Sequence, residues 1–105
     1  MRFCVLASGS AGNATYVESE GVRLLIDAGI SCRAIERHLA DLAVDPDSLD
    51  GILITHEHED HVGGLYRFAA RHQVAVYANE GTAEVIEWQA RKGKYPTPEF
   101  ALFQS

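Results

Sequence analysis

The stretch that decides the fold of this chain is residues 52–64, ILITHEHEDHVGG. It opens with three aliphatic residues, a pattern typical of a short buried strand, and it closes with Gly63 and Gly64. Between these ends, residues 56–61 hold three of the chain's five histidines and one aspartate. This density of imidazole and carboxylate groups is typical of a metal-binding loop, although a histidine-rich solvated loop without metal is the alternative.

The spacing of these residues favours an extended backbone. Side chains at positions i, i+2 and i+4 of a strand point the same way, so His56, His58 and Asp60 can converge where the strand ends. On a helix, His56 and His58 would point about 200° apart. The helical zinc-protease motif also requires a histidine where Asp60 stands. His61 joins the group only if the chain turns at Asp60 or His61, and the resulting donor set suits zinc, iron or manganese better than calcium or magnesium.

The remaining chain predicts an α/β (α+β) fold. Its largely antiparallel or mixed sheet begins with an antiparallel meander and carries helices on one face. Ser31 and Asn79 are suitable N-caps for two of the helices. The expected strands are 2–7, 14–18, 22–26, 51–54, 73–78 and one starting at 100, and the expected helices are 32–42, one following Gly64, and roughly 80–91. The apolar strand 51–54 is expected to be covered on both faces.

The motif His56-x-His58-x-Asp60-His61 resembles the signature of the metallo-β-lactamase superfamily. The stretches LASGSAGN (6–13), LIDAG (25–29) and ANEGT (78–82) extend the resemblance to the YycJ (WalJ or VicX) branch, in its N-terminal portion. This resemblance implies a single metallo-β-lactamase-like domain over residues 1–105, corresponding to the N-terminal half of the αββα sandwich. Members of the superfamily take further metal ligands from a second half, and this chain has no histidine after His72. We therefore expect the C-terminal half to be absent.

The resemblance also implies a function. It is that of a metal-dependent hydrolase, a phosphodiesterase or exonuclease acting on nucleic acid or a small phosphodiester through a metal-bound hydroxide. Two divalent metals are implied in the complete enzyme, zinc first, with manganese or iron as alternatives, and the site is expected to be incomplete in this chain. His56 and His58 would hold the first metal, and Asp60 and His61 the second, with Asp60 also catalytic. The competing hypothesis is a catalytically silent half-domain that binds metal weakly or self-associates through an exposed sheet edge.

Two residues outside the loop are also expected to contribute to the site. Asp27 follows the third predicted strand, and the resemblance implies that it accepts a hydrogen bond and orients a metal ligand without binding metal. Asn13 ends the small-residue loop 8–13. That loop is either a hairpin connection or a backbone edge that approaches a ligand, and the two interpretations are compatible.

Composition narrows the class of protein. The chain has 105 residues and a net charge of −6, which argues against a broad basic surface for nucleic acid but not against a site for one phosphodiester. Arg67 and Arg71 are expected to be solvated. Cys4 and Cys32 are too few for a disulfide framework and are expected to be reduced thiols. No stretch reaches membrane-spanning length, and we expect a cytoplasmic protein.

Overall fold

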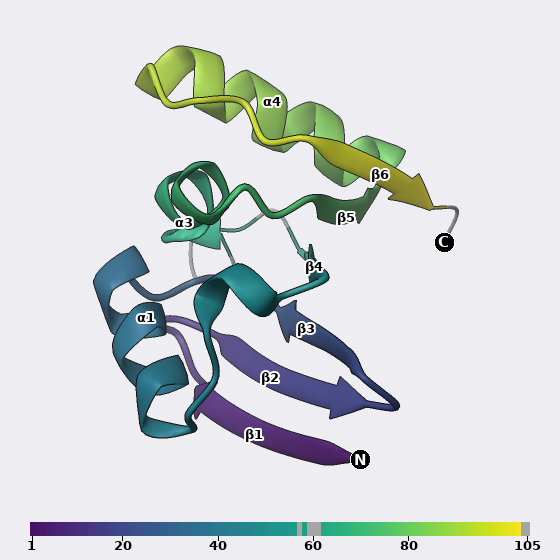
Figure 1. The fold of residues 1–105 in the computed structure, drawn as a ribbon. Helices are drawn as coiled ribbons and strands as arrows, with labels where there is room; N and C mark the ends of the chain where they lie inside the picture. The colour runs from purple at the N-terminus through teal and green to yellow at the C-terminus, as the bar shows by residue number, and fades with distance from the viewer. Residues whose placement is uncertain (57, 59–61, 104–105) are drawn as a thin grey trace.

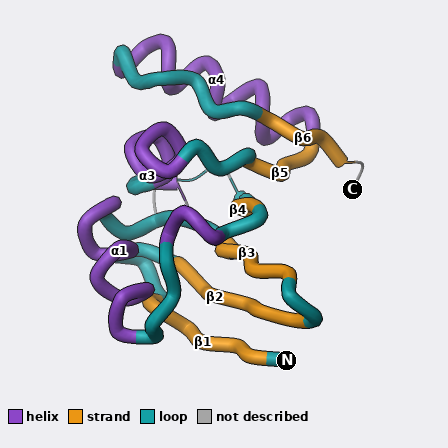
Figure 2. Tube along the Cα trace, in the orientation of Figure 1, coloured by secondary structure: helices purple, strands orange, loops and turns teal. Residues whose placement is uncertain are grey.

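The computed structural model describes residues 1–56, 58 and 62–103, and it contains one six-stranded sheet (Figure 1). The strands lie side by side in chain order, with β1 and β6 at the two edges (Figure 2). Their bounds are β1 Arg2–Ala7, β2 Ala14–Ser19, β3 Val22–Ile26, β4 Gly51–Leu53, β5 Val76–Asn79 and β6 Phe100–Phe103. The first three strands are antiparallel, and the pairs β3–β4, β4–β5 and β5–β6 are parallel. The prediction of a mixed sheet that begins with an antiparallel meander is confirmed.

Helices connect the parallel strands. They are α1 Cys32–Asp41, followed by the short 3-10 helix η1 Pro46–Ser48, then α3 Leu65–His72 and α4 Glu80–Gly93. The Ser31 hydroxyl accepts a hydrogen bond from the Ala34 amide at 3.1 Å, and the Asn79 side chain accepts one from the Thr82 amide at 2.8 Å. Both predicted N-caps are therefore confirmed. Because all three parallel connections step across the sheet in the same direction, right-handed crossovers place these helices on one face.

A single hydrophobic core lies between the sheet and its helices. Alternate strand residues point into it, and the fully buried ones include Tyr16, Leu25, Ile52 and Val76. They pack with wholly buried helix residues, namely Ile35, Leu39, Phe68 and Ile86. Each such side chain stabilises the folded state by about 1.5–3 kcal/mol. This one core holds β3 and β4 side by side and so positions the ends of both strands.

The other face of the sheet is apolar but partly open. Cross-strand pairs place Val5, Thr15, Ile26, Leu53 and Tyr77 in one row across it. Val5 is 51% exposed and Tyr77 39% exposed, while Leu53 is only half-buried. The expectation that both faces of strand 51–54 are covered is wrong for the described part of the chain. The three helices supply one covering layer, and Leu53 points away from it.

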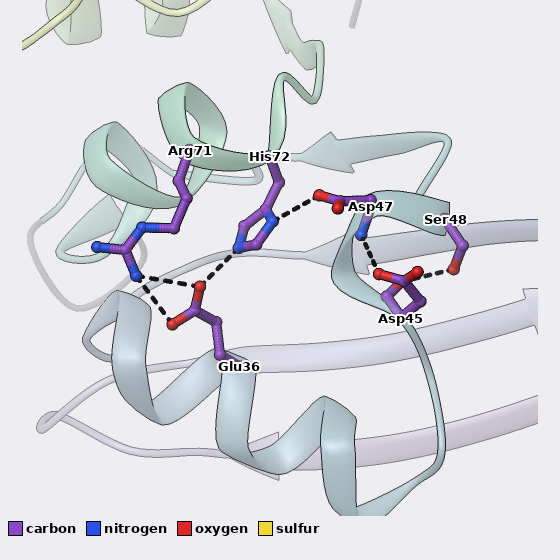
Figure 3. Close-up of polar contacts among 6 residues, drawn as sticks. All are labelled: Glu36, Asp45, Asp47, Ser48, Arg71 and His72. Atoms are coloured by element: carbon purple, nitrogen blue, oxygen red, sulfur yellow. Dashed lines mark hydrogen bonds and ion pairs between the residues drawn. The ribbon is translucent and has the colours of Figure 1, made fainter.

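A polar cluster ties α1, η1 and α3 together (Figure 3). The two ring nitrogens of His72 face different carboxylates: Nε2 lies 2.6 Å from Glu36 Oε2, and Nδ1 lies 2.7 Å from Asp47 Oδ1. Arg71 Nη1 donates to both Glu36 oxygens, at 3.0 and 3.1 Å. Hydrogen bonds from His72, and then from Arg71, hold the pKa of Glu36 below its ordinary value. Arg71 is exposed, as expected, but it is also paired with a carboxylate.

Candidate metal-binding site

The candidate site begins where two neighbouring parallel strands end. Asp27 follows β3, and Thr55 and His56 follow β4, so the three residues meet at the same edge of the sheet. Asp27 has a φ of 63°, a left-handed conformation that aspartate tolerates better than most residues. Its amide donates to the carbonyl of Leu53 at 2.8 Å. This turn of the backbone brings the Asp27 side chain to the start of the histidine loop.

The Asp27 carboxylate is buried and accepts two hydrogen bonds from Thr55. One comes from the Thr55 amide, at 2.8 Å, and the other from its hydroxyl, at 2.7 Å. The same hydroxyl oxygen lies 3.1 Å from Nδ1 of His56. A hydroxyl has one proton, and here it is donated to the carboxylate, so His56 Nδ1 must be the donor in the second bond. The lone pair of the His56 ring is then on Nε2, which is the atom a metal would bind.

His56 and His58 are both exposed on this loop, and their rings lie close to each other. The ring centroids lie 6.2 Å apart, with the planes at 44°. With a zinc-to-nitrogen distance of about 2.0–2.1 Å and tetrahedral geometry, two imidazole centroids on one ion lie about 5.2 Å apart, so the two rings would have to approach each other by about 1 Å to share an ion. By its chemistry, a pair of imidazoles suits a divalent metal. Asp60 and His61, the other two predicted ligands, lie outside the described residues, and their role stays a prediction.

The loop 8–13 is a hairpin connection between β1 and β2, as one of the two interpretations expects. The Asn13 side chain closes it, accepting from the Gly9 amide at 3.2 Å and donating to the Gly9 carbonyl at 3.0 Å. The Asn13 carbonyl accepts from the Gly29 amide at 2.8 Å, so the loop lies against the turn that holds Asp27. A contact between Asn13 and a ligand stays a prediction.

Gly64 fixes the far end of the histidine loop. Its amide donates to the carbonyl of Ala28 at 2.7 Å. A Cβ atom at this position would overlap the carbonyl oxygen of Ile30 and lie 3.1 Å from the amide nitrogen of Cys32. Only glycine allows this approach, because the backbones before α1 and at the start of α3 are in direct contact. The segment that contains Asp27 therefore anchors both ends of the loop.

A second group of potential ligands lies between α1 and α3. The ligand atoms of Cys32, Glu36 and His72 all lie within 4.8 Å of one another. Sequence reasoning missed this group, whose signal is the four-residue spacing of Cys32 and Glu36 on one helix face. Burial raises the pKa of the Cys32 thiol, and Glu36 raises it further. Because the thiol stays protonated and Glu36 already accepts from Arg71 and His72, the group serves as a polar contact between helices.

Known proteins share the sequence pattern and the fold of this chain. The family model of the metallo-beta-lactamase superfamily matches residues 7–101. The chain belongs to the metallo-β-lactamase superfamily. It is 40% identical over 103 residues to exodeoxyribonuclease WalJ of Streptococcus pneumoniae serotype 2 (strain D39) and 41% identical over 103 residues to exodeoxyribonuclease YycJ of Bacillus anthracis. Both alignments cover 98% of this chain and 38% of the relative, so the chain spans less than half the length of these proteins.

Solved structures agree on the fold. The MIM-2 metallo-β-lactamase superposes with a TM-score of 0.74 and 21% identity, over 90% of this chain and 39% of that enzyme. The predicted fold class and the resemblance to the superfamily are confirmed. Among the described helices, none has the length and apolar character needed to cross a membrane.

Proposed function

We propose that this chain carries the N-terminal part of a metal-dependent phosphodiesterase that acts on nucleic acid as an exonuclease. Its similarity to two proteins named exodeoxyribonucleases supports this choice of substrate. The observation that carries the proposal is the chain of hydrogen bonds from Asp27 through Thr55 to His56. It places the ring proton of His56 on Nδ1 and the ring lone pair on Nε2, and such an orienting hydrogen bond is typical of a metal-binding histidine and is not needed in a solvated loop.

Four residues of the loop would hold two divalent metals, with zinc preferred and manganese or iron as alternatives. His56 and His58 would bind the first metal, and Asp60 and His61 the second. When bound, such metals supply an activated water and polarise the phosphoryl oxygens. The Asp60 carboxylate would also accept a hydrogen bond from the attacking water and so orient it.

Asp27 and Thr55 would act as positioning residues. The Asp27 carboxylate holds the Thr55 hydroxyl, and that hydroxyl fixes the ring of His56 and its tautomer. Asn13 would lie at the border of the site, with the hairpin loop 8–13 approaching the substrate. A cytoplasmic location is part of the proposal, because Cys4 and Cys32 are both free thiols.

The test is metal content measured together with phosphodiester hydrolysis. The complete enzyme should hold two metals and hydrolyse single-stranded DNA from one end. The variants His56→Ala and His58→Ala should each lose metal and activity, whereas His38→Ala, which removes a histidine of α1, should lose neither. Equal metal content in the wild type and in both loop variants would refute the proposal.

One observation favours a second candidate function, a silent half-domain that self-associates. The open sheet face exposes the apolar side chains of Phe3 (63%), Val5 and Tyr77, and an apolar patch of this kind can mark a protein–protein contact. Sedimentation would separate the candidates. A stable dimer that holds no metal supports the second candidate, and a metal-loaded protein that hydrolyses DNA supports the first.

A further inference from the structure

A cavity of about 500 Å³ lies where α1 and α3 begin, beside the end of the histidine loop. Gly63 and Gly64, which directly follow the loop, form part of its wall. The charged residues among the described part of its lining are Arg33, Arg67 and Arg71, and none of the described lining residues is a carboxylate. Three cations around one cavity are unexpected in a chain with a net charge of −6. The cavity therefore has the charge needed for an anion, while the protein as a whole does not.

Two of the three arginines have no carboxylate partner among the described residues. Arg33 and Arg67 are exposed, and no carboxylate of the described residues forms an ion pair with either. Arg71 shares its guanidinium with Glu36 through Nη1 alone, which leaves its other nitrogens for further contacts. Guanidinium groups suit phosphate because their planar donors match its oxygens in pairs.

An aromatic platform adjoins the arginines. The rings of Tyr66 and Tyr95 are stacked, with centroids 5.1 Å apart and planes at 12°. Tyr66 is buried and donates to Gln89 Oε1 at 2.9 Å, whereas Tyr95 is 42% exposed. The end of α4 holds Tyr95 in place, because its amide donates to the Ala90 carbonyl at 2.8 Å. A Cβ on Gly93 would come within 2.7 Å of the Tyr95 ring, so the ring also packs closely on that backbone.

We propose that this pocket binds a backbone phosphate of a single-stranded nucleic acid, with a neighbouring base stacked on Tyr95. Cationic grooves with exposed aromatic rings bind single strands without regard to sequence, because every base has a face that can stack. The pocket shares Gly63 and Gly64 with the end of the histidine loop, so a strand held there would lie next to the proposed metals. This inference rests on the proposed function and adds a second contact with the substrate, away from the reacting phosphate.

The test is equilibrium binding of a fluorescent oligothymidine to the whole protein, in chelator so that nothing is cleaved. Arg33→Gln and Arg67→Gln should each weaken binding about tenfold, and each should reduce the slope of log K against log salt by about 0.7. Tyr95→Leu should weaken binding about tenfold with the salt slope unchanged, because stacking releases no counterions. The matched control is Arg37→Gln. Arg37 is an exposed arginine of α1, the helix that carries Arg33, but it does not line the pocket.

Several results would overturn the inference. These are an equal loss of affinity in Arg37→Gln, unchanged affinity in both pocket variants, or displacement of the strand by inorganic phosphate at the same concentration as by unlabelled oligothymidine. The last result would mean that the pocket takes free phosphate. The small substrate bis(p-nitrophenyl) phosphate cannot contact the proposed metals and the pocket at the same time. Its hydrolysis therefore tests the proposed function separately from the inference. If the wild type hydrolyses it and the pocket variants bind DNA normally, only the inference fails; if the wild type cleaves no phosphodiester, the proposed function fails.

Discussion

Replacement of Gly64 by alanine should destabilise the protein and disturb the histidine loop. Gly64 is buried where the loop ends and α3 begins. The new Cβ would overlap the Ile30 carbonyl oxygen and lie 3.0 Å from its carbonyl carbon. All of these neighbours are backbone atoms, so no side chain can rotate away. The start of α3 must move away from the segment that precedes α1.

The size of the effect follows from what that movement breaks. The hydrogen bond from the Gly64 amide to the Ala28 carbonyl is worth about 1 kcal/mol. Overpacking of a close contact costs about 1–3 kcal/mol more. The free energy of unfolding should therefore fall by about 2–4 kcal/mol, which lowers the Tm by about 8–30 °C in a domain of this size. A typical domain has about 5–15 kcal/mol of stability, so the variant should still fold at room temperature.

Thermal unfolding followed by circular dichroism would measure this effect, with Gly81→Ala as the matched control. Gly81 lies in the first turn of α4, where a Cβ would meet only Asn79 Oδ1, at 3.7 Å. Alanine is the better helix former, so this control should raise stability by up to about 1 kcal/mol. A Gly64→Ala variant with the wild-type Tm and wild-type metal affinity would refute the argument that the loop is anchored by close backbone contact.

Three further predictions concern the loop and the polar cluster. In Asp27→Asn, the new amide can donate to the Thr55 hydroxyl, which then donates to His56 Nδ1, so the ring proton moves to Nε2. Metal affinity, measured by titration, should therefore fall about 10–100-fold. The control Thr55→Ser keeps the hydroxyl and should keep the metal affinity. Chelation should abolish phosphodiester hydrolysis, and zinc or manganese should restore it in the wild type but not in His58→Ala. The lowered pKa of Glu36 means that its carboxylate stabilises the fold above its ordinary value of 4.5, and that this contribution is lost as the pH falls through the lower folded value. The Tm of Glu36→Gln should therefore lie below that of the wild type at pH 7 and approach it toward pH 3, and a gap independent of pH would contradict this assignment.

Local sequence signals predicted most of the fold. Ser31 before Ile35 and Leu39 was sufficient for α1, because the cap and the helical spacing agree on its start. Apolar-rich runs separated by the small-residue loop 8–13 and the turn at Glu20 and Gly21 predicted the first three strands, and the continuous run 52–54 predicted β4. The predicted end of α4 fell two residues short, because Arg91 and Lys92 look like a helix end and yet the helix continues to Gly93.

Contacts between distant residues could not be predicted in the same way. Nothing local to Tyr95 indicates that it stacks on Tyr66, since 29 positions separate them and the turn after α4 decides the contact. The link from Thr55 to Asp27 is likewise a product of parallel pairing between β3 and β4. The apolar composition of strand 51–54 led us to expect burial on both faces. Composition does not indicate which segments cover each face, and in the described chain the helices cover only one.

The segment Asp27–Gly29 holds the points at which the histidine loop leaves and re-enters the fold. Its three backbone groups form three hydrogen bonds: Asp27 to Leu53 in β4, Gly29 to Asn13 before β2, and Gly64 at the start of α3 to Ala28. The Asp27 side chain adds the contact with Thr55. Both ends of the loop are therefore held by one short turn, in which Asp27 and Ala28 are buried. Substitutions in this turn should consequently change metal affinity more than substitutions at exposed positions of the same sheet edge.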